Sequence, residues 1–319
     1  MISGEGRNFT LIRCADNAEW LQQRTKGVGG SDVAAIMGLS PWRTPLQVWL
    51  EKTGRETPQD ISDKPYVEFG NTMEPVIGKW YAKRYPNRHV RRVNAICRSI
   101  QRPWAQASLD YEVSEGKRWG ILEIKTARNA SDWEEGVPPY YLTQVTHYMS
   151  VTGRPFADVA VFFRDTCEYK VFRVERDEED ILAVDDAVNV FWHDYVLGDV
   201  MPEIVGTTGE IASLTSWHGA SNGDIKVTFD QKANQAISDY QDAAAREKQA
   251  KADKTAAAAK LTAEIGAAKG LETDVARVTW VRRNTTTLDT KRLQAEHPEI
   301  WQEYASTRIS NGGLRITEL

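Results

Sequence analysis

The apolar run "WGILEIKTA", residues 119–127, constrains the fold of this chain more than any other segment. Its short length and apolar content are typical of a strand inside a sheet. Side chains alternate along a strand, so Leu122 and Ile124 face one layer while Glu123 and Lys125 face the other. Such a Glu-x-Lys pair usually lies on the wet side of an edge strand, but this run is too apolar for an edge. Because burying charge without a purpose is costly, Glu123 and Lys125 are candidate functional residues.

The segments around this run predict a sheet with helices on its faces. Strand-like segments are "HVRRVNAICRSI" (89–100), "WAQASLDYEV" (104–113), "ADVAVFFRD" (157–165) and "EYKVFRVERD" (168–177). Helical patterns cover residues 17–27, 31–38, 69–85, 138–153 and 185–198. We expect Ser31 or Asp32 to cap the second helix and Glu74 to lie near the start of the third. The pattern therefore predicts an α/β fold.

The composition changes after residue 204, which predicts a domain boundary. Residues 205–225 are rich in Gly, Thr and Ser, and residues 228–268 are rich in Ala, Lys, Glu and Asp with few large apolar side chains. The remainder reads strand, helix, strand. We expect a core domain at 1–204, a linker at 205–227, and at 228–319 a charged helical region with a small strand-helix-strand unit.

Charge and cysteine content exclude several classes of protein. The chain of 319 residues has a net charge of -5, no apolar run of membrane-spanning length and no secretory signal pattern, so we expect a soluble, intracellular protein without membrane segments. Cys14, Cys97 and Cys167 are too few and too scattered for a disulfide framework or a four-cysteine iron–sulfur site. Although the net charge is negative, the segment "KRYPNRHVRR" (83–92) concentrates five Lys and Arg residues.

A metal would justify the buried carboxylate. Asp110 ends the preceding strand-like segment, twelve residues intervene before Glu123, and a hairpin of that length would bring the two carboxylates together. Two hard oxygen ligands suit Mg²⁺, which also binds waters and phosphate oxygens. Lys125 beside the metal would orient or deprotonate a water and stabilise developing negative charge. The pattern therefore predicts metal-assisted cleavage of a phosphodiester.

Four blocks, taken in order, resemble the lambda-exonuclease-type, or YqaJ-type, phage recombination nucleases. They are "WLQQRTKGVGGSDVAAIMG" (20–38), "FGNTMEPVI" (69–77), "ASLDYEV…GILEIKT" (107–126) and "YYLTQVTHYM" (140–149). The resemblance implies a restriction-endonuclease-like core, a mixed β-sheet flanked by helices, to which the sequence adds a C-terminal helical and small α+β extension. It also implies an exonuclease, dependent on Mg²⁺ or Mn²⁺ as a substitute, that digests one strand of linear duplex DNA from its 5′ end. The product would carry 3′ single-stranded overhangs for strand annealing.

The resemblance also assigns roles to individual residues. It places the metal ligands at Asp110, Glu123 and the carbonyl of Ile124, the catalytic lysine at Lys125, and a helix glutamate that can approach a second metal at Glu74. The pocket for a DNA 5′-phosphate falls on Arg24, Ser31, Ser108 and Gln144. Ser31 as a plain helix cap and Glu74 as a first-turn glutamate are the alternative interpretations.

The family implies partners as well. Relatives form closed three-subunit rings around DNA, so we expect a homotrimer, double-stranded DNA ends as substrate, and a single-strand annealing protein as partner. The setting would be the cytoplasm of a bacterial host, with a phage or prophage as the source. The competing hypotheses are a DNA endonuclease, a Cas4-like nuclease (disfavoured by the missing iron–sulfur cysteines), and a non-catalytic DNA-end-binding protein.

Overall fold

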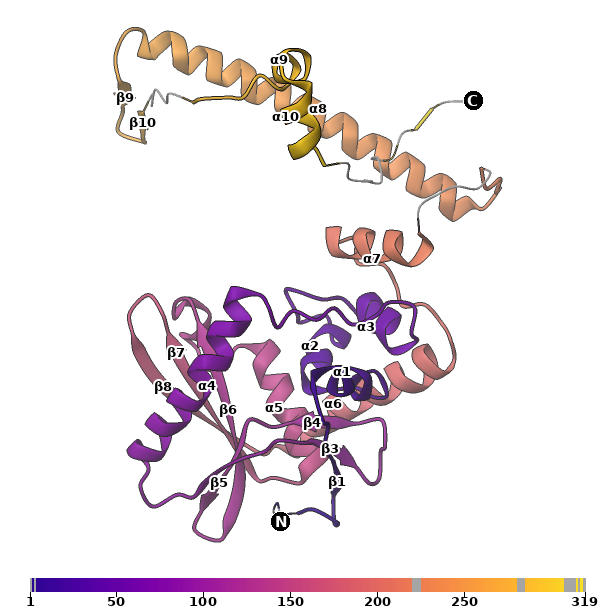
Figure 1. Cartoon of the computed structure of the whole chain (residues 1–319), viewed down its shortest axis with the longest axis vertical. Coiled ribbons are helices and arrows are strands. Elements are labelled where there is room, and N and C mark those ends of the chain that lie inside the picture. Colours follow the sequence, from indigo (N-terminus) through magenta and orange to yellow (C-terminus); the bar gives the residue numbers. More distant parts are fainter. Residues whose placement is uncertain are drawn as a thin grey trace. The chain divides into compact units, whose positions relative to one another are not determined.

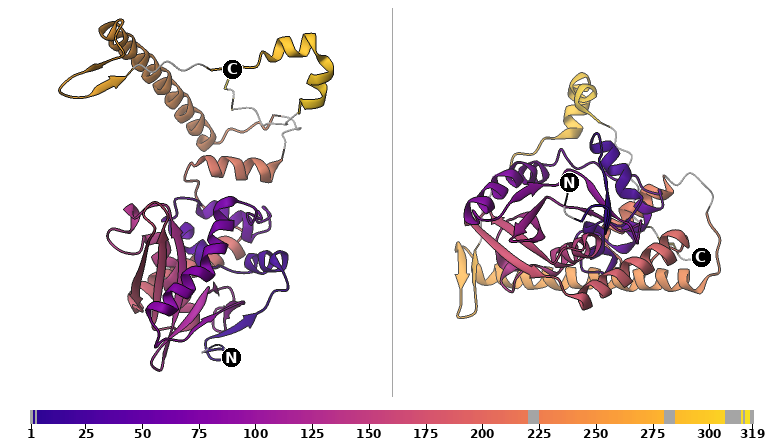
Figure 2. Two further views of the ribbon diagram at one scale, coloured as in Figure 1. Left: turned by 60° about the vertical axis from the view of Figure 1, so that its left-hand side comes forward. Right: turned by 90° about the horizontal axis from the view of Figure 1, so that it is seen from below.

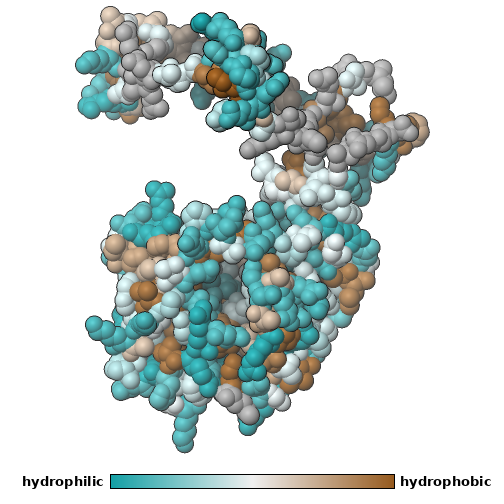
Figure 3. All heavy atoms as spheres, viewed as in Figure 1, coloured by the Kyte–Doolittle hydropathy of each residue, from teal (hydrophilic) through white to brown (hydrophobic). Residues whose placement is uncertain are grey.

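The computed structural model describes residues 2, 4–219, 225–279, 285–306, 314 and 316–317. The chain divides into two units, Met1–Ala220 and Ser221–Leu319. The first unit contains both of the larger sheets and all nine candidate site residues, and Figures 1 and 2 show helices packed along its strands. Its surface in Figure 3 is mostly hydrophilic, with hydrophobic residues scattered over the visible face.

A five-stranded mixed sheet forms the centre of the first unit. Its strand order is β2-β5-β6-β7-β8, with β6 and β7 parallel and the other neighbours antiparallel. The strands are β2 (Val90–Arg92), β5 (Tyr111–Glu115), β6 (Arg118–Ala127), β7 (Phe156–Phe163) and β8 (Glu168–Glu175). The expected position of the Glu-x-Lys strand inside the sheet is confirmed, because β6 is the middle strand. The α/β prediction, a mixed sheet flanked by helices, is also confirmed.

Two helices cover opposite faces of β6. Helix α4 (Pro65–Arg84) packs Ile77 and Tyr81 against the face that carries Leu122 and Ile124. Helix α5 (Pro139–Thr152) packs its apolar side against the opposite face, where Ile121 lies. The predicted alternation along β6 is therefore confirmed, and Glu123 and Lys125 lie on the α5 side. Figure 1 shows the two helices with the sheet between them.

Two of the predicted strands are each broken in two. Residues 89–100 form β2 and β3 (Ile96–Ser99), and residues 104–113 form β4 (Gln106–Ser108) and β5. β3 and β4 pair with β1 (Phe9–Ile12) in a separate three-stranded sheet. Asp110, which we expected to end a strand, therefore lies between β4 and β5 and belongs to neither. It lies between two sheets, and the hairpin from β5 to β6 closes tightly at Gly116, which has φ +61°.

The helices of the first unit depart from the predicted boundaries in three places, one of which is α6, which starts at Glu178 rather than at residue 185. Helix α2 is capped by Gly29, because the Asp32 carboxylate at the third helical position accepts the Gly29 N–H at 3.0 Å; neither Ser31 nor Asp32 is the N-cap. Helix α4 starts at Pro65, so Glu74 lies in mid-helix rather than near the start. The bounds are α1 (Asn17–Thr25), α2 (Gly30–Ile36), α3 (Pro45–Lys52), η1 (Ser131–Trp133), α6 (Glu178–Val190) and η2 (Phe191–Leu197).

The segment expected to be a linker contains a helix. Helix α7 (Thr208–His218) begins with a capping box between Thr207 and Glu210 and packs against α3. The Trp217 and Trp49 rings meet edge to face at 5.8 Å, which gives α7 an apolar anchor on the first unit. Residues 207–218 thus belong to the first unit, although their composition is that of a loop.

The second unit is built around α8 (Gln231–Ile265), a helix that is exposed along almost its whole length. It is followed by a two-stranded antiparallel sheet of β9 (Gly270–Glu272) and β10 (Arg277–Thr279), and then by α9 (Thr290–Glu296) and α10 (Pro298–Tyr304). The final strand predicted after residue 305 lies largely outside the described residues. No helix in the described ranges combines the length and apolarity that crossing a membrane requires.

Candidate metal centre and phosphate pocket

The carboxylate of Glu123 lies at the centre of a small polar network on β6. Its side chain is 3% exposed, and Oε1 accepts hydrogen bonds from Lys125 Nζ and Gln144 Nε2, both at 2.8 Å. Lys125 also donates to Gln144 Oε1 at 3.1 Å, which closes a triangle of three side chains. The second oxygen, Glu123 Oε2, is buried and has no hydrogen-bond partner among the described residues. A buried, unpartnered carboxylate oxygen is a position that a cation would satisfy.

Asp110 lies beside this network because of the strand register. Tyr111 pairs with Leu122 in the β5–β6 ladder, so Asp110 falls opposite Glu123. Its Oδ2 accepts the Ile124 N–H at 2.8 Å. Burial, and then the nearby charge of Asp110, raise the pKa of Glu123 to about 8. Burial likewise raises the pKa of Asp110, against the opposing effect of Lys125.

This donor set fits a hard divalent cation. Asp110 and Glu123 supply carboxylate oxygens, the carbonyl of Ile124 belongs to the same stretch of β6, and the mutual repulsion of the carboxylates would be relieved by a positive ion. Mg²⁺ requires only one or two carboxylates when waters and phosphate oxygens complete its coordination. The geometry therefore provides a place for the metal that the resemblance implies.

Glu74 is near this centre but is held by another partner. Arg92 Nη2 lies 2.9 Å from Glu74 Oε1, and the pKa of Glu74 is raised by burial and then by Asp110. Within the described residues no group of three or more His, Cys, Asp or Glu side chains is placed to hold a metal. In this arrangement Glu74 is thus not a third carboxylate ligand.

The four residues expected to bind a 5′-phosphate are only partly brought together. Arg24 Nη2 donates to Ser31 Oγ at 3.0 Å. A Cβ atom on Gly30, next to Ser31, would come within 2.9 Å of the Gln144 side chain, so α2 and α5 are in close contact there. Ser108 makes no hydrogen bond to Arg24, Ser31 or Gln144 in the described part of the chain. It lines a different cavity, of about 520 Å³, together with Arg92 and Trp20.

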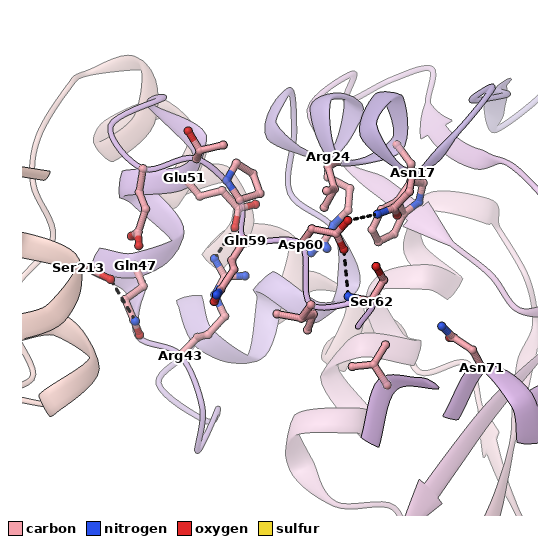
Figure 4. A pocket seen from close by; sticks show the side chains of 17 residues that line it. Asn17, Arg24, Arg43, Gln47, Glu51, Gln59, Asp60, Ser62, Asn71 and Ser213 are labelled. Atoms are coloured by element: carbon pink, nitrogen blue, oxygen red, sulfur yellow. Dashed lines mark hydrogen bonds and ion pairs between the residues drawn. The ribbon is translucent and has the colours of Figure 1, made fainter. Parts of the chain in front are cut away.

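A second cavity, of about 530 Å³, shares Asn17 and Trp20 of α1 with the first (Figure 4). Arg24, Arg43 and Glu51 line it, and the segment Glu56–Ser62 forms part of its wall. The Asp60 carboxylate accepts hydrogen bonds from Asn17 Nδ2 at 3.1 Å and from the Ser62 N–H at 3.0 Å, as drawn in Figure 4. Arg24 therefore faces a space large enough for part of a nucleic-acid chain.

The charged cluster that supports Arg24 could not be predicted from sequence spacing. Asp32 is fully buried, and its carboxylate contacts Lys52 Nζ at 2.8 Å and Arg43 Nη1 at 3.0 Å. Arg24 Nη2 lies 3.7 Å away, and Lys52 also donates to the Arg24 backbone carbonyl at 2.9 Å. These positive neighbours hold the pKa of Asp32 well below its usual range, although burial alone would raise it. No spacing links Asp32 to Arg43 and Lys52, which come from the next loop and from α3.

Comparisons with known proteins agree with the resemblance. Residues 19–155, which include all nine candidate site residues, match the YqaJ-like viral recombinase domain. The uncharacterized protein YqaJ of Bacillus subtilis (strain 168) is 33% identical over 227 residues, which cover 70% of this chain and 70% of that protein.

Among solved structures, an alkaline exonuclease from Laribacter hongkongensis matches with a TM-score of 0.49 and 22% identity, over 58% of this chain and 94% of its own. A phage related exonuclease from Haemophilus somnus 129PT matches with a TM-score of 0.41 and 14% identity, over 54% of this chain and 96% of its own. Both TM-scores are too low to inform the activity of this chain. The identity to YqaJ and the match over residues 19–155 are sufficient for the family: this chain belongs to the YqaJ-like viral recombinase family.

Proposed function

We propose that this chain is a Mg²⁺-dependent 5′-to-3′ exonuclease that digests one strand of linear double-stranded DNA. The observation that carries the proposal is the buried, unpartnered Oε2 of Glu123, which lies beside Asp110, while the other oxygen, Oε1, accepts from Lys125 and Gln144. Family membership supports a lambda-exonuclease-like nuclease. The metal, the strand polarity and the recombination role are parts of the proposal.

Each residue of the centre has a role in this proposal. A bound Mg²⁺ would polarise the phosphodiester and lower the pKa of an attacking water. Asp110 and Glu123 would hold the ion, and Lys125 would orient or deprotonate the water and stabilise negative charge on the phosphate. Gln144 positions both Lys125 and Glu123 through its two hydrogen bonds. Glu74 is a candidate for a second metal only if its ion pair with Arg92 opens.

The phosphate pocket would give the enzyme its polarity. Arg24 supplies a charge-assisted contact for a terminal 5′-phosphate, with the Ser31 hydroxyl within hydrogen-bond distance of its guanidinium. The short helix α2 adds little, because the buried Asp32 already occupies its N-terminal turn. Gln144 would border the pocket on the metal side, whereas Ser108 lines the separate cavity with Arg92 and Trp20 and is not part of the pocket in this arrangement. The product, a 3′ single-stranded overhang, suits a single-strand annealing protein in the cytoplasm of a bacterial host.

The test compares linear with circular duplex DNA in Mg²⁺ and in chelator. We expect only linear DNA to be degraded, and only with metal. Glu123→Ala should lower the single-turnover rate at least about 100-fold while thermal melting stays close to the unmutated protein, because the loss is one of transition-state stabilisation.

Glu168→Ala, on the exposed surface of β8, is the matched control and should keep full activity. Degradation of circular DNA would indicate the endonuclease instead. An unmutated protein that binds DNA ends without cutting would indicate an end-binding protein, and an active Glu123→Ala protein would refute the metal centre.

A further inference from the structure

An exposed tryptophan lies on the loop between α2 and α3. The Trp42 side chain is 64% exposed, although large aromatic side chains are usually well buried. The loop that carries it is firmly held. Ser40 Oγ accepts the backbone N–H groups of Trp42 and Arg43, both at 3.2 Å, and the Arg43 guanidinium binds Asp32 at 3.0 Å and Glu51 at 2.8 Å. Trp42 is therefore presented to solvent by an anchored loop.

A line of aromatic rings connects Trp42 to the candidate metal centre. The Trp42 ring meets Tyr140 edge to face, with centroids 4.9 Å apart and an interplanar angle of 76°. Tyr140 in turn contacts Tyr141 at 4.6 Å, and Lys125 Nζ lies 4.6 Å from the centre of the Tyr141 ring. An edge-to-face contact leaves ring faces uncovered, in contrast to a stacked pair. The line thus begins with open aromatic surface and ends at Lys125.

Trp133 and Asp132 hold Tyr141 and Tyr140 in place. Trp133, which is 4% exposed, packs against Tyr141 with centroids 5.6 Å apart. The Tyr140 hydroxyl donates to Asp132 Oδ2 at 3.3 Å. Tyr141 also precedes Gln144 by one turn of α5, and Gln144 is bonded to Glu123. The aromatic surface therefore adjoins the candidate metal centre and is not an isolated exposed side chain.

We propose that Trp42 and Tyr140, here called the aromatic platform, stack on an unpaired nucleobase of the DNA strand whose phosphodiester lies at Glu123 and Lys125. The inference rests on the proposed nuclease function. A strand held at Lys125 through its phosphate projects its bases to the side. The flat faces of these bases can stack on aromatic rings whatever the base sequence. A paired duplex hides those base faces, so the platform engages the strand only where the end has opened.

The experiment measures single-turnover cleavage in Mg²⁺ as a function of protein concentration. The substrate is a 5′-phosphorylated duplex in which each of the first three nucleotides of either strand at the end is replaced, one at a time, by an abasic residue. Trp42→Ala should raise the half-saturating concentration about tenfold and leave the maximal rate within about twofold, because stacking contributes to binding rather than to the chemical step. Trp42→Phe, which keeps an aromatic face, should stay within about threefold of the unmutated protein.

The decisive measurement is whether the effect of Trp42→Ala and the effect of an abasic nucleotide on binding depend on each other. At one nucleotide the abasic substitution should weaken binding of the unmutated protein about tenfold and have almost no further effect on Trp42→Ala, since both changes remove the same contact. Phe229→Ala, a 93% exposed aromatic in the second unit, is the control for loss of a surface ring. Additive effects at every nucleotide, or a Trp42→Ala protein that binds as before, would overturn the platform and leave a protein partner as the occupant of Trp42. A protein that cuts no substrate at all would instead refute the nuclease function.

Discussion

At the scale of single residues, the site depends on one buried aspartate. Asp32 contacts Arg43 and Lys52, lies 3.7 Å from Arg24, and accepts the Gly29 N–H that starts α2. A buried carboxylate with this many partners holds them in one arrangement, because an unpaired charge in such a position would be very costly. The orientation of Arg24 is therefore set by contacts within the protein itself.

The first prediction at this scale concerns DNA ends. The unmutated protein should degrade duplexes with a 5′-phosphate about tenfold faster or more than those with a 5′-hydroxyl, because a phosphate gains a charge-assisted contact with Arg24. Arg24→Ala should erase that preference. The measurement is the ratio of initial rates on the two end-labelled substrates.

Lys26 is exposed and lies two positions after Arg24, so Lys26→Ala is the matched control for loss of a positive charge. It should keep the preference for a 5′-phosphate end. The pocket would be wrong if the unmutated protein ignored the phosphate, or if the label showed shortening from the 3′ terminus.

At the scale of elements, α5 links the two sheets of the first unit. His147 of α5 is fully buried, and its Nε2 lies 3.2 Å from the Val28 carbonyl and 3.1 Å from the Gln106 carbonyl. With carbonyls on that side, Nε2 is the protonated nitrogen and donates to both. Nδ1 is buried without a partner in the described part of the chain. A second proton on Nδ1 would place an uncompensated charge in the core, which is why burial lowers the pKa of His147.

This environment predicts a pH-dependent stability. The unfolded chain takes up a proton at His147 near pH 6.5, whereas the folded chain resists it down to a lower pH. Because the unfolded state binds more protons in that interval, the free energy of unfolding should fall as pH falls below about 6.5, by up to about 1.4 kcal/mol per pH unit. His147→Gln should remove this contribution.

Urea unfolding between pH 5 and 7 measures the difference in slope between the two proteins. His89→Gln, on the exposed surface, is the matched control and should retain the slope of the unmutated protein. Equal slopes for His147→Gln and the unmutated protein would contradict the assignment.

At the scale of the whole molecule, the proposed function requires a chain of net charge -5 to stay on DNA. The basic segment 83–92 offers less free charge than its sequence suggests. Arg88 is paired with Asp158 and Glu115, Arg91 with Glu112, and Arg92 with Glu74. Three of its five cations are therefore neutralised within the protein. An open groove that relied on this segment would bind weakly, whereas enclosure of the DNA needs fewer phosphate contacts.

We therefore predict a closed homotrimer. In such a ring each chain contacts its two neighbours through two different surfaces, which together form one type of heterologous interface. Light scattering coupled to size exclusion should give three times the chain mass of 36.0 kDa. A threaded ring should also resist removal from long linear DNA by competitor DNA, and should leave quickly once the strand ends. A monomeric mass at working concentration in a fully active preparation would defeat the ring.

Much of the central architecture could be predicted from local sequence alone. The alternation along "GILEIKT" is a property of strand geometry, so it placed Leu122 and Ile124 on one face and Glu123 and Lys125 on the other without knowledge of the neighbours. The apolar spacing of 138–153 likewise predicted the helix α5, but not that nearly all of its sides are buried. Strand alternation and helical spacing depend only on residues close together in the sequence, so they can be predicted without knowledge of the tertiary structure.

Other features were decided only by the tertiary structure. The break at Asp110 depends on two sheets diverging at that point, and the place of α7 depends on an apolar contact with Trp49 that its loop-like composition hides. The Asp32 cluster joins side chains from a helix start, a loop and a second helix, for which no spacing rule exists. Glu74 lies in the expected block, but its ion pair with Arg92 depends on how the next element, β2, packs beside α4. Sequence determined which groups are chemically suited to the site; the packing of separate elements decided which of them meet, because contact between distant segments depends on the whole fold.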